Sequence, residues 1–177
     1  MRIRLDAVIM LFELTGLMTS AAAATSIGLL VQQERTAHYR LELLLGPNEK
    51  MFSPAEAAAQ HPTSGEVMAG GDLSMMGMSM DMGDTRHLEV HVYSLDSGKV
   101  VTDASVAITV TGANPKKPET VPVAKMYGIK EGPPDTHYGN NVSLPPGNYT
   151  VAITVNGERA EFTVAIPGSY GGVHGPT

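Results

Sequence analysis

The segment from Arg86 to Tyr93 alternates strictly between apolar and polar residues, and it constrains the fold of this chain more than any other segment. In an extended strand its apolar residues share one side: Leu88, Val90 and Val92. Its polar and aromatic residues share the opposite side: His87, Glu89, His91 and Tyr93. Thr, Ser or Lys usually occupy the solvent-facing side of a half-buried strand, whereas this strand carries two imidazoles and a carboxylate there. The segment therefore predicts a β-strand with one core face and one face of possible metal ligands.

The rest of the sequence favours an all-β domain. Short alternating segments follow one another at close spacing, and Gly, Pro, Asn and Asp separate them as turn residues. Asn156-Gly157 stands between two such segments and predicts a type I′ hairpin. We expect an immunoglobulin-like β-sandwich of about seven strands at residues 86–167. Residues 128–141, which include two prolines and three glycines, are expected to form a long connection between strands.

The N-terminal region, residues 1–31, has the features of an export signal. A short basic start is followed by a segment without any charge from Leu14 to Val31, and small residues within it offer Ala-x-Ala cleavage sites. The same segment is barely long enough to be an uncleaved membrane-anchoring helix. Either interpretation places the following domain outside the cytoplasm, in the periplasm or an equivalent extracytoplasmic space.

Three further regions differ in composition from the sandwich. Residues 32–71 are expected to add an N-terminal strand and a short helix, with Ser53 as its N-cap and Pro54 at its first position. Residues 72–85 form a methionine-rich loop of low complexity, and residues 168–177 form a flexible Gly-rich tail.

Composition and motifs exclude several function classes. The formal net charge is −6 and no basic patch is present, so we expect no nucleic-acid binding. The chain has no cysteine, which excludes disulfides, thiolate zinc sites and blue-copper sites. It also lacks Gly-x-Ser-x-Gly and similar nucleophile motifs, so we do not expect an enzyme, although a redox copper site could oxidise Fe(II).

The histidines and methionines suggest a transition-metal site. Successive residues on one side of a strand lie roughly 6.6 Å apart, so His87 and Glu89 can approach one ion. His137 lies in a turn-like context, and Met126 ends the strand that leads to it. Imidazole with thioether and no thiolate suits copper, while a carboxylate also tolerates Cu(II) or Fe(II). The alternative for the strand histidines is an ordinary polar surface.

The methionine-rich loop is a second candidate site, for Cu(I). Its methionines are interleaved with Gly, Ser and Asp, a poor pattern for core packing: Met75, Met76, Met78, Met80 and Met82. The loop is predicted to be either a labile Cu(I)-binding segment or a segment that packs against the domain or contacts a partner.

Two motifs resemble a known family. His87-Leu88-Glu89-Val90-His91, followed by His137-Tyr138-Gly139-Asn140-Asn141-Val142, is similar to the periplasmic iron-transport proteins of the Tpd type, over about residues 64–166. The resemblance implies an immunoglobulin-like copper protein that assists iron uptake beside a membrane iron permease and is often dimeric. It implies the following site residues here: His87, Glu89, Met126, His137 and, as the downstream histidine, His174.

Three functions remain open from the sequence. The first is an exported iron-uptake protein with a copper site. The second is a copper chaperone or resistance protein that uses the methionine-rich loop. The third is a membrane-anchored accessory subunit without a metal. The sequence leaves the physiological metal, the partner, the oligomeric state and the roles of His38, His61 and His91 undecided.

Overall fold

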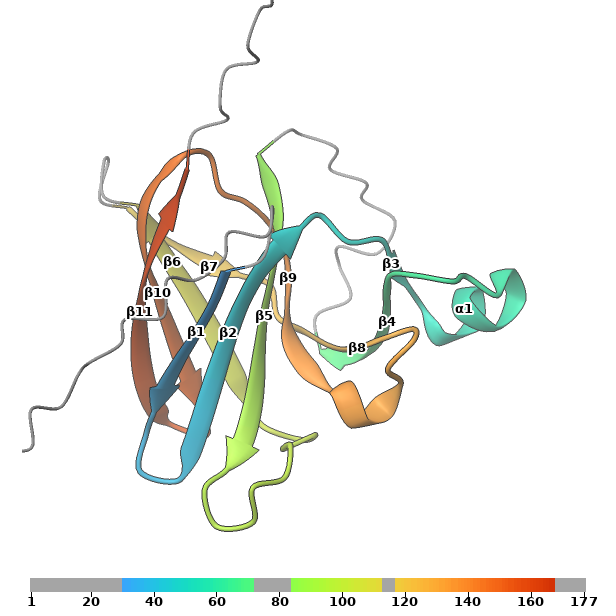
Figure 1. Ribbon diagram of the computed structural model, residues 1–177, viewed down its shortest axis with the longest axis horizontal. Helices are drawn as coiled ribbons and strands as arrows, with labels where there is room; N and C mark the ends of the chain where they lie inside the picture. Colours follow the sequence, from blue (N-terminus) through green and yellow to red (C-terminus); the bar gives the residue numbers. More distant parts are fainter. Residues whose placement is uncertain (1–29, 72–83, 113–116, 168–177) are drawn as a thin grey trace, which may run out of the picture.

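The computed structural model describes residues 30–71, 84–112 and 117–167, which form two β-sheets packed face to face and one short helix (Figure 1). The larger sheet contains, in spatial order, β1 (Leu30–Arg35), β2 (Tyr39–Pro47), β5 (Thr85–Ser94), β9 (His137–Ser143), β8 (Ala124–Gly128), β4 (Glu66–Gly71) and β3 (Met51–Phe52). The smaller sheet contains β11 (Glu158–Ile166), β10 (Gly147–Val155), β6 (Val106–Gly112) and β7 (Pro118–Val121). The predicted all-β sandwich is confirmed.

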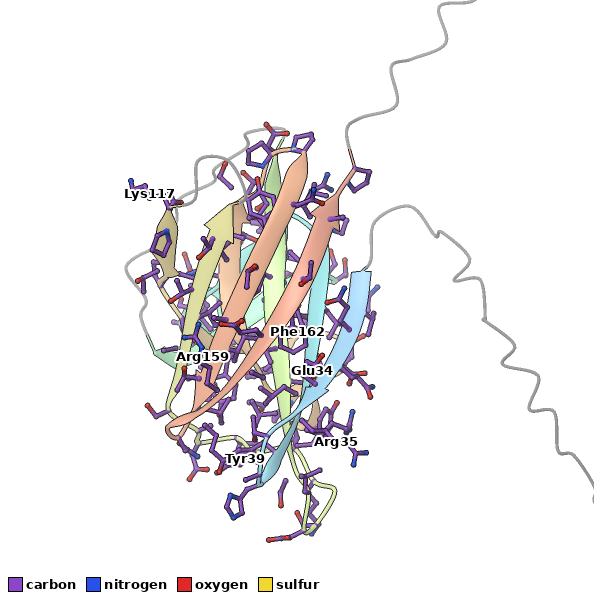
Figure 2. The ribbon with its side chains drawn as sticks, turned by 90° about the vertical axis from the view of Figure 1, so that its left-hand side faces the viewer. Glu34, Arg35, Tyr39, Lys117, Arg159 and Phe162 are labelled. Atoms are coloured by element: carbon purple, nitrogen blue, oxygen red, sulfur yellow. The ribbon has the colours of Figure 1, made fainter. Side chains whose placement is uncertain are left out.

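The core lies between the two sheets and is built from alternate residues of the long strands. Phe162 on β11, labelled in Figure 2, is 2% exposed and belongs to this core. The apolar side of β5 contributes three residues that are completely buried: Leu88, Val90 and Val92. The alternation read from the sequence therefore positions β5 correctly, with one face in the sandwich core and the other directed away from it.

The sandwich begins earlier in the chain than predicted. β2 pairs with β5 from Tyr39 to Pro47, and its buried Leu41, Leu43 and Leu45 belong to the same core. Residue 86 is therefore too late a boundary, because β2, which lies between β1 and β5, buries its three leucines in the same core. The expected number of about seven strands for residues 86–167 is confirmed, since β5 to β11 are seven strands, and β1 to β4 precede them in the described part of the chain.

The predicted long connection at residues 128–141 is wrong in its second half. Residues from His137 onward form β9, which pairs with β5 on one side and with β8 on the other. Gly139, Asn140 and Asn141 have low strand propensity, but pairing with β5 holds all three in the sheet, and Gly139 also pairs with β8. His137 therefore starts a central strand and does not lie in a loop.

Two local predictions are confirmed. Helix α1 (Pro54–Gln60) begins after Ser53, which accepts a hydrogen bond from the Glu56 backbone N–H in a capping box. The β10–β11 hairpin turns at Asn156 and Gly157, both with positive φ, as an Asn-Gly turn requires.

No helix in the described part of the chain is long and apolar enough to cross a membrane.

Three predicted regions lie wholly or largely outside the described residues. Of the predicted signal or anchor segment, only Leu30 and Val31 are described, and they begin β1. The methionine-rich loop is described only from residue 84, and the tail with His174 is not described.

Gly139 is required for the close approach of β9 to β5. A Cβ at this position would overlap the Leu88 carbonyl oxygen and would lie 2.9 Å from Glu89 Cα. We therefore expect Gly139→Ala to reduce the free energy of unfolding by about 3 kcal/mol, measured by urea denaturation. Gly147→Ala is the matched control, because its Cβ would meet nothing closer than 3.7 Å; equal effects of the two substitutions would contradict this account.

Candidate metal centre

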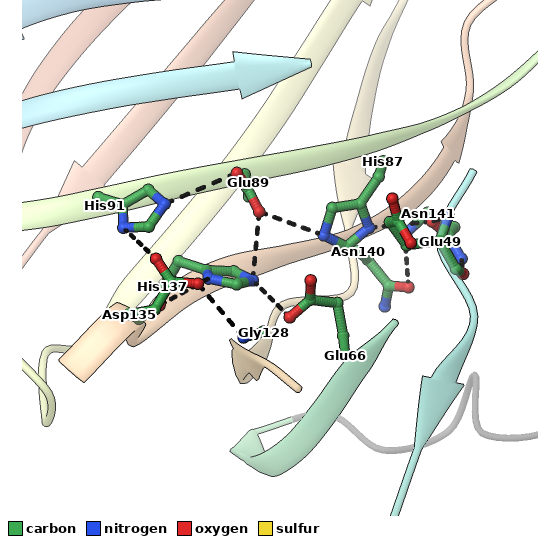
Figure 3. Close-up of polar contacts among 10 residues, drawn as sticks. All are labelled: Glu49, Glu66, His87, Glu89, His91, Gly128, Asp135, His137, Asn140 and Asn141. Atoms are coloured by element: carbon green, nitrogen blue, oxygen red, sulfur yellow. Dashed lines mark hydrogen bonds and ion pairs between the residues drawn. The ribbon is translucent and has the colours of Figure 1, made fainter. Parts of the chain in front are cut away.

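A cluster of polar side chains lies on the face of the larger sheet that is directed away from the sandwich core (Figure 3). β5 supplies His87 and Glu89 from its polar side, and β9 supplies His137 from its first position. β4 supplies Glu66 from its first position, which pairs with Gly128 of β8. Three strands, β4, β5 and β9, thus bring together two imidazoles and two carboxylates that span 71 residues of the chain, since 137 − 66 is 71.

One atom of each side chain converges on a common point. Glu89 Oε2 lies 3.3 Å from His137 Nε2 and 3.5 Å from His87 Nε2. Glu66 Oε2 lies 3.4 Å from His137 Nε2. All four ligand atoms lie within 4.8 Å of one another. The side chains of His87 and His137 are only 4% and 1% exposed, so the cluster is shielded from solvent on the imidazole side.

The ring of His87 is held in one orientation by Asn141. The Asn141 side chain accepts a hydrogen bond from the Glu49 backbone N–H with Oδ1 and donates one to the Glu49 carbonyl with Nδ2. These two backbone contacts determine which end of the amide faces His87, because a backbone N–H only donates and a carbonyl only accepts. Asn141 Oδ1 therefore accepts a hydrogen bond from His87 Nδ1 at 3.0 Å, and a neutral His87 presents its Nε2 lone pair to the cluster.

The ring of His137 is held in the same way by the main chain. Its Nδ1 donates to the backbone carbonyl of Asp135 at 2.9 Å, so Nε2 carries the lone pair when the ring is neutral. A ligand imidazole that donates its other N–H to a carbonyl or amide oxygen is the usual arrangement around protein-bound metals. Both histidines of the cluster meet this condition before any ion is considered.

Within the described residues, three of the four converging atoms have no hydrogen-bond partner: Glu66 Oε2, His87 Nε2 and His137 Nε2. Buried polar atoms are nearly always paired, so three such atoms at one point require an explanation. With both imidazoles neutral, four acceptor atoms face one another and repel. A cation at their centre would satisfy all of them at once.

The pKa shifts of His137 and Glu89 show that the cluster favours positive charge on its histidines and negative charge on its carboxylates. Burial lowers the pKa of His137, but the close carboxylate of Glu66 and the negative charges of Glu89 and Glu66 outweigh this effect and raise the pKa to about 8. Burial would raise the pKa of Glu89, yet its contacts with His87 and His91 and the charge of His137 hold the pKa well below 4.5. The cluster thus stabilises positive charge, whether it is carried by protons or by an ion.

The spacing of the ligand atoms fits a four-coordinate metal ion. Bonds of about 2.0–2.1 Å from nitrogen and oxygen ligands place tetrahedral ligand atoms about 3.3–3.4 Å apart. Three of the six separations between the ligand atoms are 3.3, 3.4 and 3.5 Å. These separations are too long for strong hydrogen bonds and are close to the edges of such a tetrahedron. Glu66, His87, Glu89 and His137 are therefore suited to hold one ion.

The structure brings together three of the residues singled out in the sequence, His87, Glu89 and His137. Reasoning from the sequence missed Glu66, which is the first residue of β4. Glu66 carries no local signal of its role, because it reaches the site only when β4 pairs with β8.

Met126 lies on the same side of the sheet as His137. Its side chain is not one of the four that converge in the cluster. It pairs directly with His137 across β8 and β9, and with Met68 across β8 and β4. Its side chain is completely buried and packs with Met68, Ala124 and Met51 in a small second core. The predicted ligands His174, Met75, Met76, Met78, Met80 and Met82 lie outside the described residues.

His91 and Asp135 border the cluster without being part of the four-ligand set. His91 Nε2 lies 3.6 Å from Glu89 Oε1, and His91 Nδ1 lies 4.0 Å from Asp135 Oδ1. The ring of His91 also stacks on Tyr93, with ring centroids 6.2 Å apart and an interplanar angle of 15°. His91, undecided from the sequence, therefore lies beside the cluster and not on an exposed surface.

The Asn141 contact gives a prediction about metal affinity. We expect Asn141→Leu, which keeps the approximate volume but cannot hold the His87 ring, to weaken metal binding by about 10- to 100-fold in isothermal titration. Circular dichroism would verify that the fold is kept. Asn148→Leu, on the exposed start of β10, is the control. Unchanged affinity in a folded Asn141→Leu protein would show that the amide does not position His87.

Comparison of the chain with protein-family models, with curated proteins and with solved structures finds no match. The interpretation of the cluster as a metal centre therefore depends on its own side chains. The resemblance to the Tpd-type family stays a prediction.

Proposed function

We propose that this protein binds one divalent first-row transition-metal ion at Glu66, His87, Glu89 and His137, and that it handles this ion outside the cytoplasm. The observation that carries the proposal is the convergence of four ligand atoms, three of them buried without a hydrogen-bond partner, with separations of 3.3, 3.4 and 3.5 Å that suit a tetrahedral site. A polar surface would have left these atoms in contact with water or with donors.

The ligand set favours a divalent ion over Cu(I). Two carboxylates and two neutral imidazoles carry a charge of −2, which a divalent ion neutralises and a monovalent ion does not. Among divalent ions, affinity for such nitrogen and oxygen ligands rises toward Cu(II) and is lower for Fe(II) and Mn(II). We therefore expect Cu(II) to bind most tightly in solution and Fe(II) to bind more weakly at the same site.

Four protein ligands favour binding over catalysis. A catalytic metal centre usually keeps one coordination position for water or substrate, whereas a closed set of four does not. The described part of the chain thus supports a carrier or storage role. This agrees with the prediction that the protein is not an enzyme, without testing it.

The finer proposal follows the resemblance found in the sequence. We infer an immunoglobulin-like, exported, copper-binding protein that assists iron uptake beside a membrane permease, with a homodimer as a further possibility implied by the family. The Cu(I)-handling alternative would depend on the methionine-rich loop, because the described ligand set has no exposed thioether and is poorly suited to Cu(I).

The experiment is isothermal titration of the full chain with Cu(II), Zn(II), Co(II) and Mn(II), and with Cu(I) under anaerobic conditions. We expect one tight equivalent of divalent ion, lost in His87→Ala/His137→Ala and kept when the five loop methionines are changed to Leu. His38→Ala/His61→Ala is the matched control, since it also removes two imidazoles but both are exposed. Cu(I) binding that is lost only in the methionine variant would favour the copper-handling alternative.

Metal affinity should depend on pH in a defined range. His137 has a pKa raised from 6.5 to about 8, so below about pH 8 the metal must displace its proton. Because His137 must lose its proton, we expect the apparent affinity to rise about tenfold per pH unit from pH 6 to pH 8. Above pH 8 His137 is neutral, and its contribution to the pH dependence ends. Titrations at several pH values measure the slope. A pH-independent affinity between pH 6 and pH 8 would contradict a role of His137 as ligand.

A further inference from the structure

A pocket of about 370 Å³ lies directly outside the metal cluster and is strongly acidic. Two of the proposed ligands, Glu66 and Glu89, line its inner wall. Three further carboxylates line its outer part: Glu49, Glu131 and Asp135. Among the described lining residues, Lys130 is the one ammonium, so the lining charge is 1 − 5 = −4.

His91 stands in the wall of this pocket between its outer and inner parts. Its side chain is 9% exposed, and neither of its ring nitrogens makes a hydrogen bond within the described part of the chain. The nearest carboxylate oxygens are those of Glu89 at 3.6 Å and of Asp135 at 4.0 Å, one on each nitrogen. A buried imidazole that makes no hydrogen bond among the described residues and lies between two carboxylates offers an ion a nitrogen ligand on the way to the cluster.

Described residues cover the cluster on the sides away from the pocket. On one side lies the sheet itself, and behind it the sandwich core. Asn141 with the Glu49 main chain covers His87, and the Asp135 main chain covers His137. The ligands that line the pocket are also the more exposed ones. The side chains of Glu66 and Glu89 are 12% and 16% exposed, whereas those of His87 and His137 are 4% and 1% exposed.

We propose that this acidic pocket is the route by which the metal ion enters and leaves the site, and that His91 with Asp135 forms a transient binding position along it. The inference rests on the proposed function, since it concerns the loading of the same four-ligand site. A negatively charged concave surface raises the local concentration of a cation and its association rate, and this effect falls as salt screens it. The residues of the outer pocket should thus act on rates, whereas the four ligands act on equilibrium affinity.

Charge substitutions at the rim should change the association rate in opposite directions. Lys130 and Glu131 are adjacent, exposed and both line the pocket. In low salt we expect Glu131→Gln to slow association of a divalent ion by about threefold and Lys130→Gln to accelerate it by about threefold. Both effects should vanish in about 1 M salt, where the Debye length is about 3 Å. Glu161→Gln, on exposed β11 and paired with Arg159, is the charge-matched control and should change nothing.

The test is stopped-flow mixing of the full chain with Co(II), followed by the visible absorption that a tetrahedral Co(II) site produces. His91→Gln should slow both association and dissociation by about tenfold and keep the equilibrium affinity within threefold, because it removes a position on the route and not a final ligand. Asp135→Asn, which keeps the backbone carbonyl that holds His137, should slow them less. An inner-ligand variant such as His87→Gln should instead lower the affinity itself.

Each outcome decides the proposal. Opposite rate changes in the two rim variants, together with a rate effect of His91→Gln at unchanged affinity, support the entry route. Rates that do not respond to the rim charges, or an affinity loss in His91→Gln as large as in His87→Gln, overturn the route and leave the metal site intact. No Co(II) binding by the unmodified protein overturns both the route and the proposed function.

Discussion

Replacing Glu89 by Gln should weaken divalent-metal binding by about 1,000-fold, or about 4 kcal/mol. Glu89 is the residue most central to the cluster, because its Oε2 faces His87 and His137 while its Oε1 faces His91. Gln has the same shape but no negative charge, so the change removes the electrostatic attraction for the ion and keeps the packing. Isothermal titration with Zn(II) measures the loss.

Glu42→Gln is the matched control for Glu89→Gln. Glu42 lies on the neighbouring strand β2, pairs in register with His91, and contacts Arg40 at 3.6 Å. It is not one of the converging side chains, so its substitution should change the affinity by less than about twofold. Comparable losses in the two variants would indicate a general charge effect and would contradict coordination by Glu89.

Metal loading should raise the melting temperature substantially, and this rise should depend on Glu66. At a free-metal concentration of about 1,000 times the dissociation constant, binding stabilises the folded state by about 4 kcal/mol, which corresponds to roughly 8–16 °C for a chain of this size. Removal of the metal with EDTA should return the melting temperature to that of the metal-free protein. Scanning calorimetry with and without Zn(II) measures the difference.

Glu66→Gln should reverse the order of stability in the absence of metal. The buried Glu66 Oε2 has no hydrogen-bond partner among the described residues, and it faces the Nε2 lone pair of a neutral His137. At about pH 9, above the His137 pKa of about 8, that imidazole is neutral and a Gln amide could donate to its lone pair, so at this pH we expect the metal-free variant to be more stable than the metal-free wild type by about 1 kcal/mol. With metal present the wild type should be the more stable protein. A variant that is less stable under both conditions would show that Glu66 has a structural role.

The part of the fold that could be predicted is the part with a local signal. The alternation of β5, the Ser53 N-cap before α1 and the Asn-Gly turn each depend on residues that are neighbours in sequence, and all three are as predicted. β9 could not be predicted in this way, because its Gly and Asn residues favour turns and become a strand only between β5 and β8. Tertiary hydrogen bonding overrides the propensity of such a segment.

The same distinction explains the site. His87 and Glu89 share one side of one strand, so their proximity follows from the strand period alone. Their relation to His137 was inferred from residue type and resemblance. Glu66 could not have been found, because its place is determined by the order of strands in the sheet, in which β4 lies beside β8. The support of His87 by Asn141 depends similarly on the register Leu88–Asn140 and His87–Asn141 between β5 and β9.

The most direct test of the metal centre is anomalous diffraction from crystals of the full chain grown with Zn(II) or Cu(II), recorded at the absorption edge of the metal. The account predicts one strong peak about 2.0–2.2 Å from Glu66 Oε2, His87 Nε2, Glu89 Oε2 and His137 Nε2. A protein that binds the ion in solution but shows its peak elsewhere, with these four atoms too far away to be ligands, would contradict the central claim.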